Sequence, residues 1–268
     1  MPVVLVASPP TMDYMVYEDS VVPRPGGPAL YSSFGASIVG WKVYAVGPWG
    51  WETMETTRVE WELGVERLGY QAAGRGAVFR HVYMGSRRLS EILGRPEGFR
   101  VEELLRAIDE VKPDAILLSP ITGEESGYVA ELLAHRSDVK CVGLDVQGYV
   151  RGYGGIWDAF VPEGRSYLIH VSSDDTGEEG LWSAVDSMGP RGVIVYTRGP
   201  GPVSLIVEGN EVRLPGPTRY IKDPTGAGDI FTTITLASYC ETGDIVYAVK
   251  RALELTPEAL EEARRSLG

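Results

Sequence analysis

Five short apolar runs recur along this 268-residue chain, each of a length that suits a strand buried on both faces of a sheet. They occupy residues 3–7, 43–46, 115–118, 139–144 and 193–197. Helical patterns lie between them, and the clearest spans 101–111, where apolar side chains fall on one helical face before a proline at 113. Because strand and helix alternate, the sequence predicts an α/β fold with a doubly wound, mainly parallel sheet flanked by helices.

Two segments interrupt this alternation, at about 14–25 and 76–92. Both are rich in β-branched and aromatic residues, which favours strands. We expect them to form a small accessory β-sheet inserted into a single domain that spans 1–268. Apolar residues on both faces of such a sheet need a cover, so the pattern favours a homodimer formed through it.

Composition narrows the class of protein. The formal net charge is −12 and no basic cluster is longer than a pair of arginines, so nucleic acid is not an expected partner. No apolar run approaches the roughly 18–20 residues that span a bilayer, and we expect a cytoplasmic protein with no membrane partner. Cys141 and Cys240 are too few and too isolated for a disulfide framework, and we expect both to be buried apolar residues.

The clearest chemical signal is Asp-Pro-Thr-Gly-Ala-Gly-Asp at 223–229, directly before an apolar run that suits a buried helix. At a helix start, the amides of Gly226, Ala227 and Gly228 would favour a negative charge and form an anion hole. Asp229 would repel that anion, so a carboxylate there makes sense as the base that takes a proton from an attacking hydroxyl. The alternative is a tight loop capped by Asp229, in which Asp223 serves a turn.

The seven-residue string resembles the C-terminal signature of the ribokinase-like sugar kinases, the PfkB family. Gly26-Gly27, followed by helical and strand patterns, is similar to the second signature of that family. The resemblance is to a short, archaeal-type carbohydrate kinase, and it implies a ribokinase-like fold in which the accessory sheet is a lid over the sugar. It also implies that Asp13 binds substrate hydroxyls beside the Gly26-Gly27 turn. Tyr31 stands where the family commonly has Asn, so it is a further candidate substrate contact.

Candidates for the phosphate side also follow from the resemblance. The segment 145–151 resembles an Asp-x-Asn-x-x-Arg motif with Gln147 in place of Asn, so Arg151 is a candidate phosphate ligand, or else it ties loops together. Arg198, Gly199 and Gly201 follow a strand where family members carry a turn that touches nucleotide phosphates, although Gly201 comes one residue early. Arg198 could pair with a phosphate because its planar guanidinium stays charged.

Two further residues are candidates for binding magnesium and the nucleotide. Asp175 lies three residues after Ser172, the spacing of a family motif that organises magnesium through water. The alternative for this segment is a helix N-cap. Thr225, inside the seven-residue string, is assigned to nucleotide binding. We interpret His170 as a core residue.

Together these features predict an ATP-dependent kinase that transfers the γ-phosphoryl group to a hydroxyl of a sugar or polyol, with Mg²⁺ as cofactor and ATP as co-substrate. The sequence leaves two alternatives open: a nucleoside kinase of the same family, and a non-catalytic sugar or nucleotide sensor on the kinase fold. No Walker A motif is present, which disfavours P-loop enzymes. The last helical pattern is short and covers about 257–266. From this short helix we expect the part of the active site that binds adenine to be smaller than is usual in the family.

Overall fold

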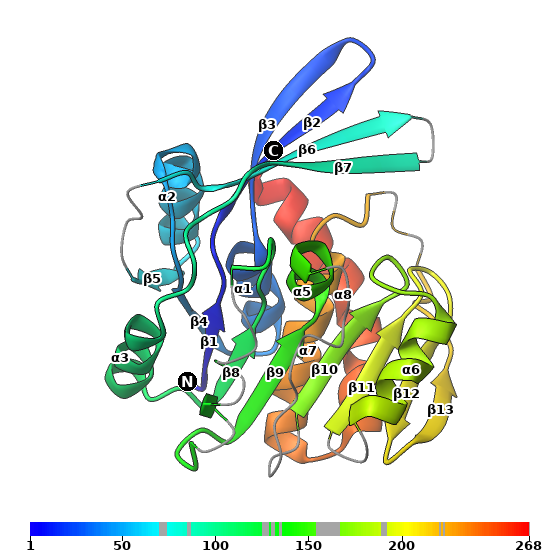
Figure 1. The fold of residues 1–268 in the computed structure, drawn as a ribbon. Helices are drawn as coiled ribbons and strands as arrows, with labels where there is room; N and C mark the ends of the chain where they lie inside the picture. The colour runs from blue at the N-terminus through cyan, green and yellow to red at the C-terminus, as the bar shows by residue number, and fades with distance from the viewer. Residues whose placement is uncertain are drawn as a thin grey trace.

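The computed structural model describes residues 1–69, 74–84, 87–124, 129, 132–133, 136–153, 167–188, 192–219, 221 and 223–267. Nine strands form the main sheet: β1 Val3–Ala7, β4 Lys42–Val46, β5 Glu66–Leu68, β8 Ala115–Leu118, β9 Cys141–Asp145, β10 Tyr167–Ser172, β11 Gly192–Thr197, β12 Val203–Val207 and β13 Asn210–Leu214. Their order is β13-β12-β11-β10-β9-β8-β1-β4-β5, parallel except for β12 and β13 (Figure 1). The predicted doubly wound, mainly parallel sheet is confirmed.

Helices cover both faces of this sheet. They are α1 Pro28–Ile38, α2 Met54–Glu62, α3 Val101–Val111, α5 Gln147–Tyr153, α6 Glu178–Met188, α7 Ala227–Thr242 and α8 Ile245–Leu267. Side chains alternate across a strand, so β1 sends Val4 and Val6 into the core under α1, α7 and α8, and Leu5 into the core under α3 and α6. All three side chains are buried, which explains why this strand is a continuous apolar run.

A second sheet of four strands stands above the carboxyl ends of the main sheet (Figure 1). It consists of β2 Thr11–Tyr17, β3 Ser20–Gly26, β6 Ala77–Met84 and β7 Arg87–Gly94, in the order β3-β2-β6-β7. The accessory sheet expected at 14–25 and 76–92 is therefore present, although its first strand begins earlier, at Thr11. Residues 85 and 86 of the second expected segment lie outside the described residues.

The last helix is longer than the sequence pattern predicts. The expectation of one short helix at about 257–266 is wrong, because α8 runs from Ile245 to Leu267 with Pro257 inside it. Proline usually marks a helix start or a break, since it lacks the N–H that would bond four residues back. Here α8 packs along α7 and α1, and this tertiary packing stabilises the helix on both sides of Pro257.

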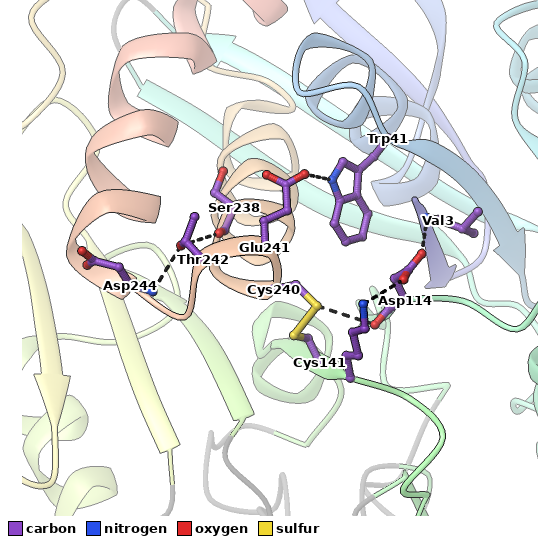
Figure 2. The surroundings of a disulfide bond; sticks show 10 residues. Val3, Trp41, Asp114, Cys141, Ser238, Cys240, Glu241, Thr242 and Asp244 are labelled. Atoms are coloured by element: carbon purple, nitrogen blue, oxygen red, sulfur yellow. Dashed lines mark hydrogen bonds and ion pairs between the residues drawn. A yellow bond between two sulfur atoms is a disulfide. The ribbon is translucent and has the colours of Figure 1, made fainter. Parts of the chain in front are cut away.

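A disulfide bond joins Cys141 to Cys240, so the expectation of two unpaired apolar cysteines is wrong (Figure 2). Cys141 begins β9 and Cys240 lies in the last turn of α7, which packs on that strand. The two Cα atoms are 5.8 Å apart, within the usual range for a disulfide. The two cysteines are 99 residues apart in the sequence, so local sequence patterns do not show this pairing.

Within the described residues, no helix is long and apolar enough to cross a membrane.

Candidate active site

A cavity of about 430 Å³ opens at the carboxyl ends of β9, β10 and β11, facing the start of α7. Ligands of open α/β sheets bind at this edge, because the loops that leave parallel strands converge there. Polar groups from the strand ends line part of the cavity, and apolar side chains from β12, α8 and the region after β13 line another part. The apolar side comprises Val203, Pro217, Ile221, Leu253 and Pro257.

The start of α7 forms the floor of this cavity. Gly226 has a left-handed backbone with φ 81°, and a Cβ there would lie 2.1 Å from the Tyr31 ring, so only glycine fits. The Thr225 amide donates to the Asp223 carboxylate at 3.1 Å, and the Ala227 amide donates to the Pro224 carbonyl at 2.9 Å. The turn at Asp223, which belongs to the alternative interpretation of this segment, is therefore present. Because the Ala227 amide is engaged, an anion would be held chiefly by the glycine amides on either side of it.

Asp229 lies in the first turn of α7 and borders the cavity. Burial raises the pKa of its carboxyl to about 7, and the nearby Asp145 carboxylate adds to that rise. Arg151 and His170 oppose it. The side-chain amide of Gln147 donates to Asp229 Oδ1 at 3.5 Å. A carboxyl with a pKa near neutrality can accept a proton and release it again under ordinary conditions, as a general base must.

His170 is buried beneath this carboxyl, within β10. Its Nδ1 lies 3.1 Å from Asp145 Oδ2, and its Nε2 lies 3.1 Å from Thr197 Oγ1. Burial disfavours the charged ring, but the Asp145 carboxylate outweighs that effect and holds the pKa of His170 above its ordinary value. The Asp145 carboxylate also accepts a hydrogen bond from the main-chain N–H of Gln147 at 3.0 Å. Through its contacts with Asp145 and Thr197, His170 therefore links the ends of β9, β10 and β11.

Asp175 and Arg198 lie on the strand-end side of the cavity. The Asp175 carboxylate accepts hydrogen bonds from the Ser172 amide and hydroxyl, at 2.9 and 2.8 Å. Burial raises the pKa of Asp175, and the Asp145 charge raises it further. Arg198 donates to Glu178 at 2.9 Å and to Ser204 at 2.8 Å, so its guanidinium is held in place by protein partners.

The predicted acceptor residues lie at the base of the lid. A Cβ on Gly26 would lie 2.5 Å from Asp13 Oδ2, so glycine leaves room for that carboxylate. Gly27 has φ 109° and caps the start of α1. Tyr31 is buried in the first turn of α1, and burial raises the pKa of its hydroxyl, with Asp13 and Asp229 as further causes. Asp13 and Asp229, which are far apart in the sequence, therefore both act on the Tyr31 hydroxyl.

The structure brings most of the sequence-predicted site together around one cavity. Its lining includes these predicted residues: Arg151, Asp175, Arg198, Gly199, Thr225, Gly226, Ala227, Gly228 and Asp229. Asp13, Gly26, Gly27 and Tyr31 lie outside that lining, at the lid side. Gly201 does not line the cavity, and its amide donates to the Arg198 carbonyl at 2.9 Å in a tight turn.

Sequence reasoning missed three polar residues in and around the site. His170 lines the cavity although it is also a core residue, and Gln147 contacts Asp229 directly. The only sequence signal for His170 is a polar residue within an apolar strand pattern, next to the predicted carboxyl edge. His81 of the lid is a third, with Nε2 4.0 Å from Asp13 Oδ2 and Nδ1 2.8 Å from Ser90 Oγ.

Comparisons with known proteins identify the fold. No family model matches the sequence, and no curated protein matches it either. Among solved structures, a pyrophosphate-dependent kinase in the ribokinase family, complexed with a pyrophosphate analog and myo-inositol, matches with a TM-score of 0.75 and 18% identity over 98% of this chain and 100% of that one. The chain has the ribokinase fold.

Other kinases with the ribokinase fold are also similar to this chain. Adenosine kinase of Anopheles gambiae matches with a TM-score of 0.72 and 15% identity, over 98% of this chain and 96% of that one. Fructokinase of Xylella fastidiosa, with bound ATP, matches with a TM-score of 0.68 and 16% identity, over 97% of this chain and 88% of that one. The ribokinase fold accordingly extends over nearly the whole chain, lid included.

Proposed function

We propose that this protein is a kinase that transfers the γ-phosphoryl group of ATP to a hydroxyl of a sugar or polyol. The observation that carries the proposal is Asp229, a carboxyl with a pKa near 7, set in the first turn of α7 beside glycine amides that favour an anion. Phosphoryl transfer needs little more from a protein than positioning, charge stabilisation and a group that orients the attacking hydroxyl. Solved structures of similar fold include kinases of a sugar, a polyol and a nucleoside.

In this proposal each group has one task. Asp229 accepts the proton of the acceptor hydroxyl, and Asp13 holds a neighbouring hydroxyl beside the Gly26-Gly27 turn. The start of α7 stabilises the charge of the transferring phosphoryl group, and Arg151, which also lines the cavity, adds positive charge. The lid strands β2, β3, β6 and β7 lie over the acceptor and would exclude water, which otherwise competes for the phosphoryl group.

The residues present fit a magnesium ion bound through water. No group of three or more His, Cys, Asp or Glu side chains among the described residues is arranged to hold a metal directly. However, the Asp145 carboxylate raises the pKa of both Asp175 and Asp229, and a divalent cation would relieve this mutual repulsion. Mg²⁺ commonly keeps several waters, so Asp175 would reach it indirectly, as predicted. When bound, the ion would neutralise charge on the donor phosphates.

Pyrophosphate is a second candidate donor. It is favoured by the similarity to the pyrophosphate-dependent kinase over the whole of that chain. It is disfavoured by the apolar side of the cavity, which includes Val203, Leu253 and Pro257 and would suit a nucleobase. We therefore keep ATP as the proposed donor and test both.

The deciding experiment measures product formation with ATP or pyrophosphate across a panel of sugars, polyols and nucleosides. We expect turnover with magnesium and one acceptor, and a loss of at least about 10³-fold in kcat for Asp229→Asn, because the base is removed. Asp109→Asn, an exposed carboxylate on α3, is the matched control and should retain wild-type turnover. Ligand binding without turnover by the wild-type protein under any condition would instead identify a sensor.

Two further expectations remain proposals. The lid exposes Tyr17, Val21, Val22, Leu89 and Leu93, and these apolar side chains support a homodimer formed through the lid. Light scattering of the purified protein tests this directly. A cytoplasmic location is also proposed from composition, although disulfide bonds inside cells are common only in hyperthermophiles.

A further inference from the structure

A second cavity, of about 300 Å³, lies behind the predicted anion hole. Its lining comes from four separate parts of the chain: Arg24 and Pro25 of β3, Tyr31 of α1, Asp223 and Thr225 before α7, and Leu260, Ala263, Arg264 and Leu267 of α8. Figure 1 shows the C-terminal end of α8 rising to the base of the lid, where β3 leads into α1. Tyr31 and Thr225 are also candidates for the proposed kinase site, whereas Arg24, Arg264 and the α8 side chains of this cavity have no role in it.

Two guanidinium groups and a single carboxylate give this cavity a positive balance. Arg24 lies 3.6 Å from Asp223 Oδ2, which is an ion pair without a short hydrogen bond. Arg264 donates to the main-chain carbonyl of Asp223, so its charge is not neutralised by that contact. The Asp223 carboxylate is shared, because its Oδ1 also accepts from the Thr225 amide at 3.1 Å. Each guanidinium has five N–H donors, so both retain donors for a ligand.

Apart from the hydroxyl groups of Tyr31 and Thr225, the rest of the lining is apolar. Leu260 and Ala263 are buried, and Leu267 and Pro25 are half-buried. The cavity lies near the C-terminal end of α8, where the helix dipole weakly disfavours an anion, so attraction has to come from the two arginines. Because a planar guanidinium matches a carboxylate or phosphate in a bidentate geometry, the fitting ligand is an anion of that kind with one apolar flank.

We propose that this second cavity, lined by Arg24 and Arg264, is a binding site for a small organic anion, either a carboxylate or a phosphate monoester. The site is connected to the first cavity by Thr225, which lines both. It is also connected by Tyr31, whose ring packs against Gly226 so closely that a Cβ there would lie 2.1 Å away. A ligand touching Thr225 and Tyr31 therefore contacts the two residues that support the anion hole.

Inorganic phosphate is the probe for binding, measured by calorimetry on the purified protein. We expect Arg264→Gln and, separately, Arg24→Gln to weaken one phosphate-binding event by about tenfold or more, because each removes a charge-assisted donor. Arg265→Gln is the matched control, since Arg265 is the next residue of α8 but is exposed and paired with Glu262. Its binding should stay within about twofold of wild type, because exposed ion pairs contribute little.

Crystals soaked in tungstate, a phosphate mimic with strong anomalous scattering, locate the anion. A peak between Arg24 and Arg264 is expected. Peaks confined to Gly226–Gly228, or phosphate binding that is unchanged in both arginine variants, would overturn the proposal. Arg24→Gln guards against misfolding, since it removes only the 3.6 Å ion pair and leaves the contact of Arg264 with Asp223 intact.

Two sources of the anion are then distinguished by kinetics, and this step rests on the proposed kinase function. If the group belongs to the acceptor, Arg264→Gln raises KM for sugar phosphates and not for neutral sugars. If it belongs to a separate effector, phosphate changes turnover of a neutral sugar in wild type and not in Arg264→Gln. Absence of any turnover would refute the kinase and leave the binding and tungstate results to decide the site.

Discussion

At the scale of single residues, Asp229 combines a functional position with a cost in stability. Its folded pKa of about 7 lies above the value near 3.9 of an unfolded Asp. Between these values the folded state binds more protons than the unfolded state, so the free energy of unfolding falls as pH rises from about 4 to 7. Asp229→Asn removes this penalty. We expect the variant to be more stable than wild type by roughly 2 kcal/mol at pH 8, allowing for partial solvent screening.

Urea unfolding at pH 4 and pH 8 checks this expectation. The difference between variant and wild type should be small at pH 4, where Asp229 is protonated in the folded state, and should grow towards pH 8. Asp109→Asn should show no such growth, because the Asp109 carboxylate is exposed on α3. A difference that is equal at the two pH values would contradict the assigned electrostatics.

His170 should behave in the opposite sense. Its folded pKa lies above the unfolded value near 6.5, so its charge contributes stability that is present below that value and is lost as pH rises through the folded pKa. We expect His170→Ala to lower the free energy of unfolding by about 3 kcal/mol at pH 6, because Asp145 loses a buried partner. The loss should be smaller at pH 9. Thr197→Val, which removes the other hydrogen bond of the ring, should cost about 1 kcal/mol at both pH values.

The sequence predicts Asp229 and misses His170 for a physical reason. Glycines beside a carboxylate at a helix start form a local pattern, and both its conformation and its chemistry follow from adjacent residues. The role of His170 depends on Asp145 and Thr197, which lie on the neighbouring strands β9 and β11. Strand register is not visible in a single sequence, so a polar residue in an apolar run was interpreted as core.

At the scale of elements, the junction of α7 and α8 is set by Gly243. This residue has φ 69° and caps α7, and a Cβ built on it would meet nothing within 4 Å. Its replacement by alanine therefore costs only the left-handed conformation. We expect Gly243→Ala to lower the free energy of unfolding by about 1 kcal/mol and to leave catalysis unchanged.

Thermal or urea unfolding measures this cost, and the chain offers a matched control. Gly177 also has open space around its Cβ position but has no left-handed backbone, and it stands directly before α6, so Gly177→Ala should cost less than Gly243→Ala. Equal effects of the two substitutions would mean that backbone conformation is not what ends α7.

Elements with regular periodicity are predicted well, and those that depend on packing are not. The strand β1, the strand β8 and the helix α3 begin and end where their apolar patterns do. The sequence pattern predicts only the second half of α8, whereas packing on α7 continues the helix on both sides of Pro257. Local sequence patterns therefore predict where a helix can begin, but packing against a neighbouring helix such as α7 determines where it begins in the folded protein.

At the scale of the whole molecule, the Cys141–Cys240 disulfide closes a long loop that contains β10, β11, β12, β13, α5 and α6. A cross-link between residues 99 apart restricts the unfolded chain strongly, and removing a native disulfide typically costs about 2–4 kcal/mol. We expect a reductant to lower the urea midpoint of the wild-type protein accordingly. The double variant Cys141→Ser with Cys240→Ser should unfold at the lower urea midpoint whether or not reductant is present. A wild-type urea midpoint that is unchanged by reductant would contradict the cross-link. Turnover at low temperature should persist in both, because Cys240 and Asp229 lie at opposite ends of α7, about 16 Å apart along the helix.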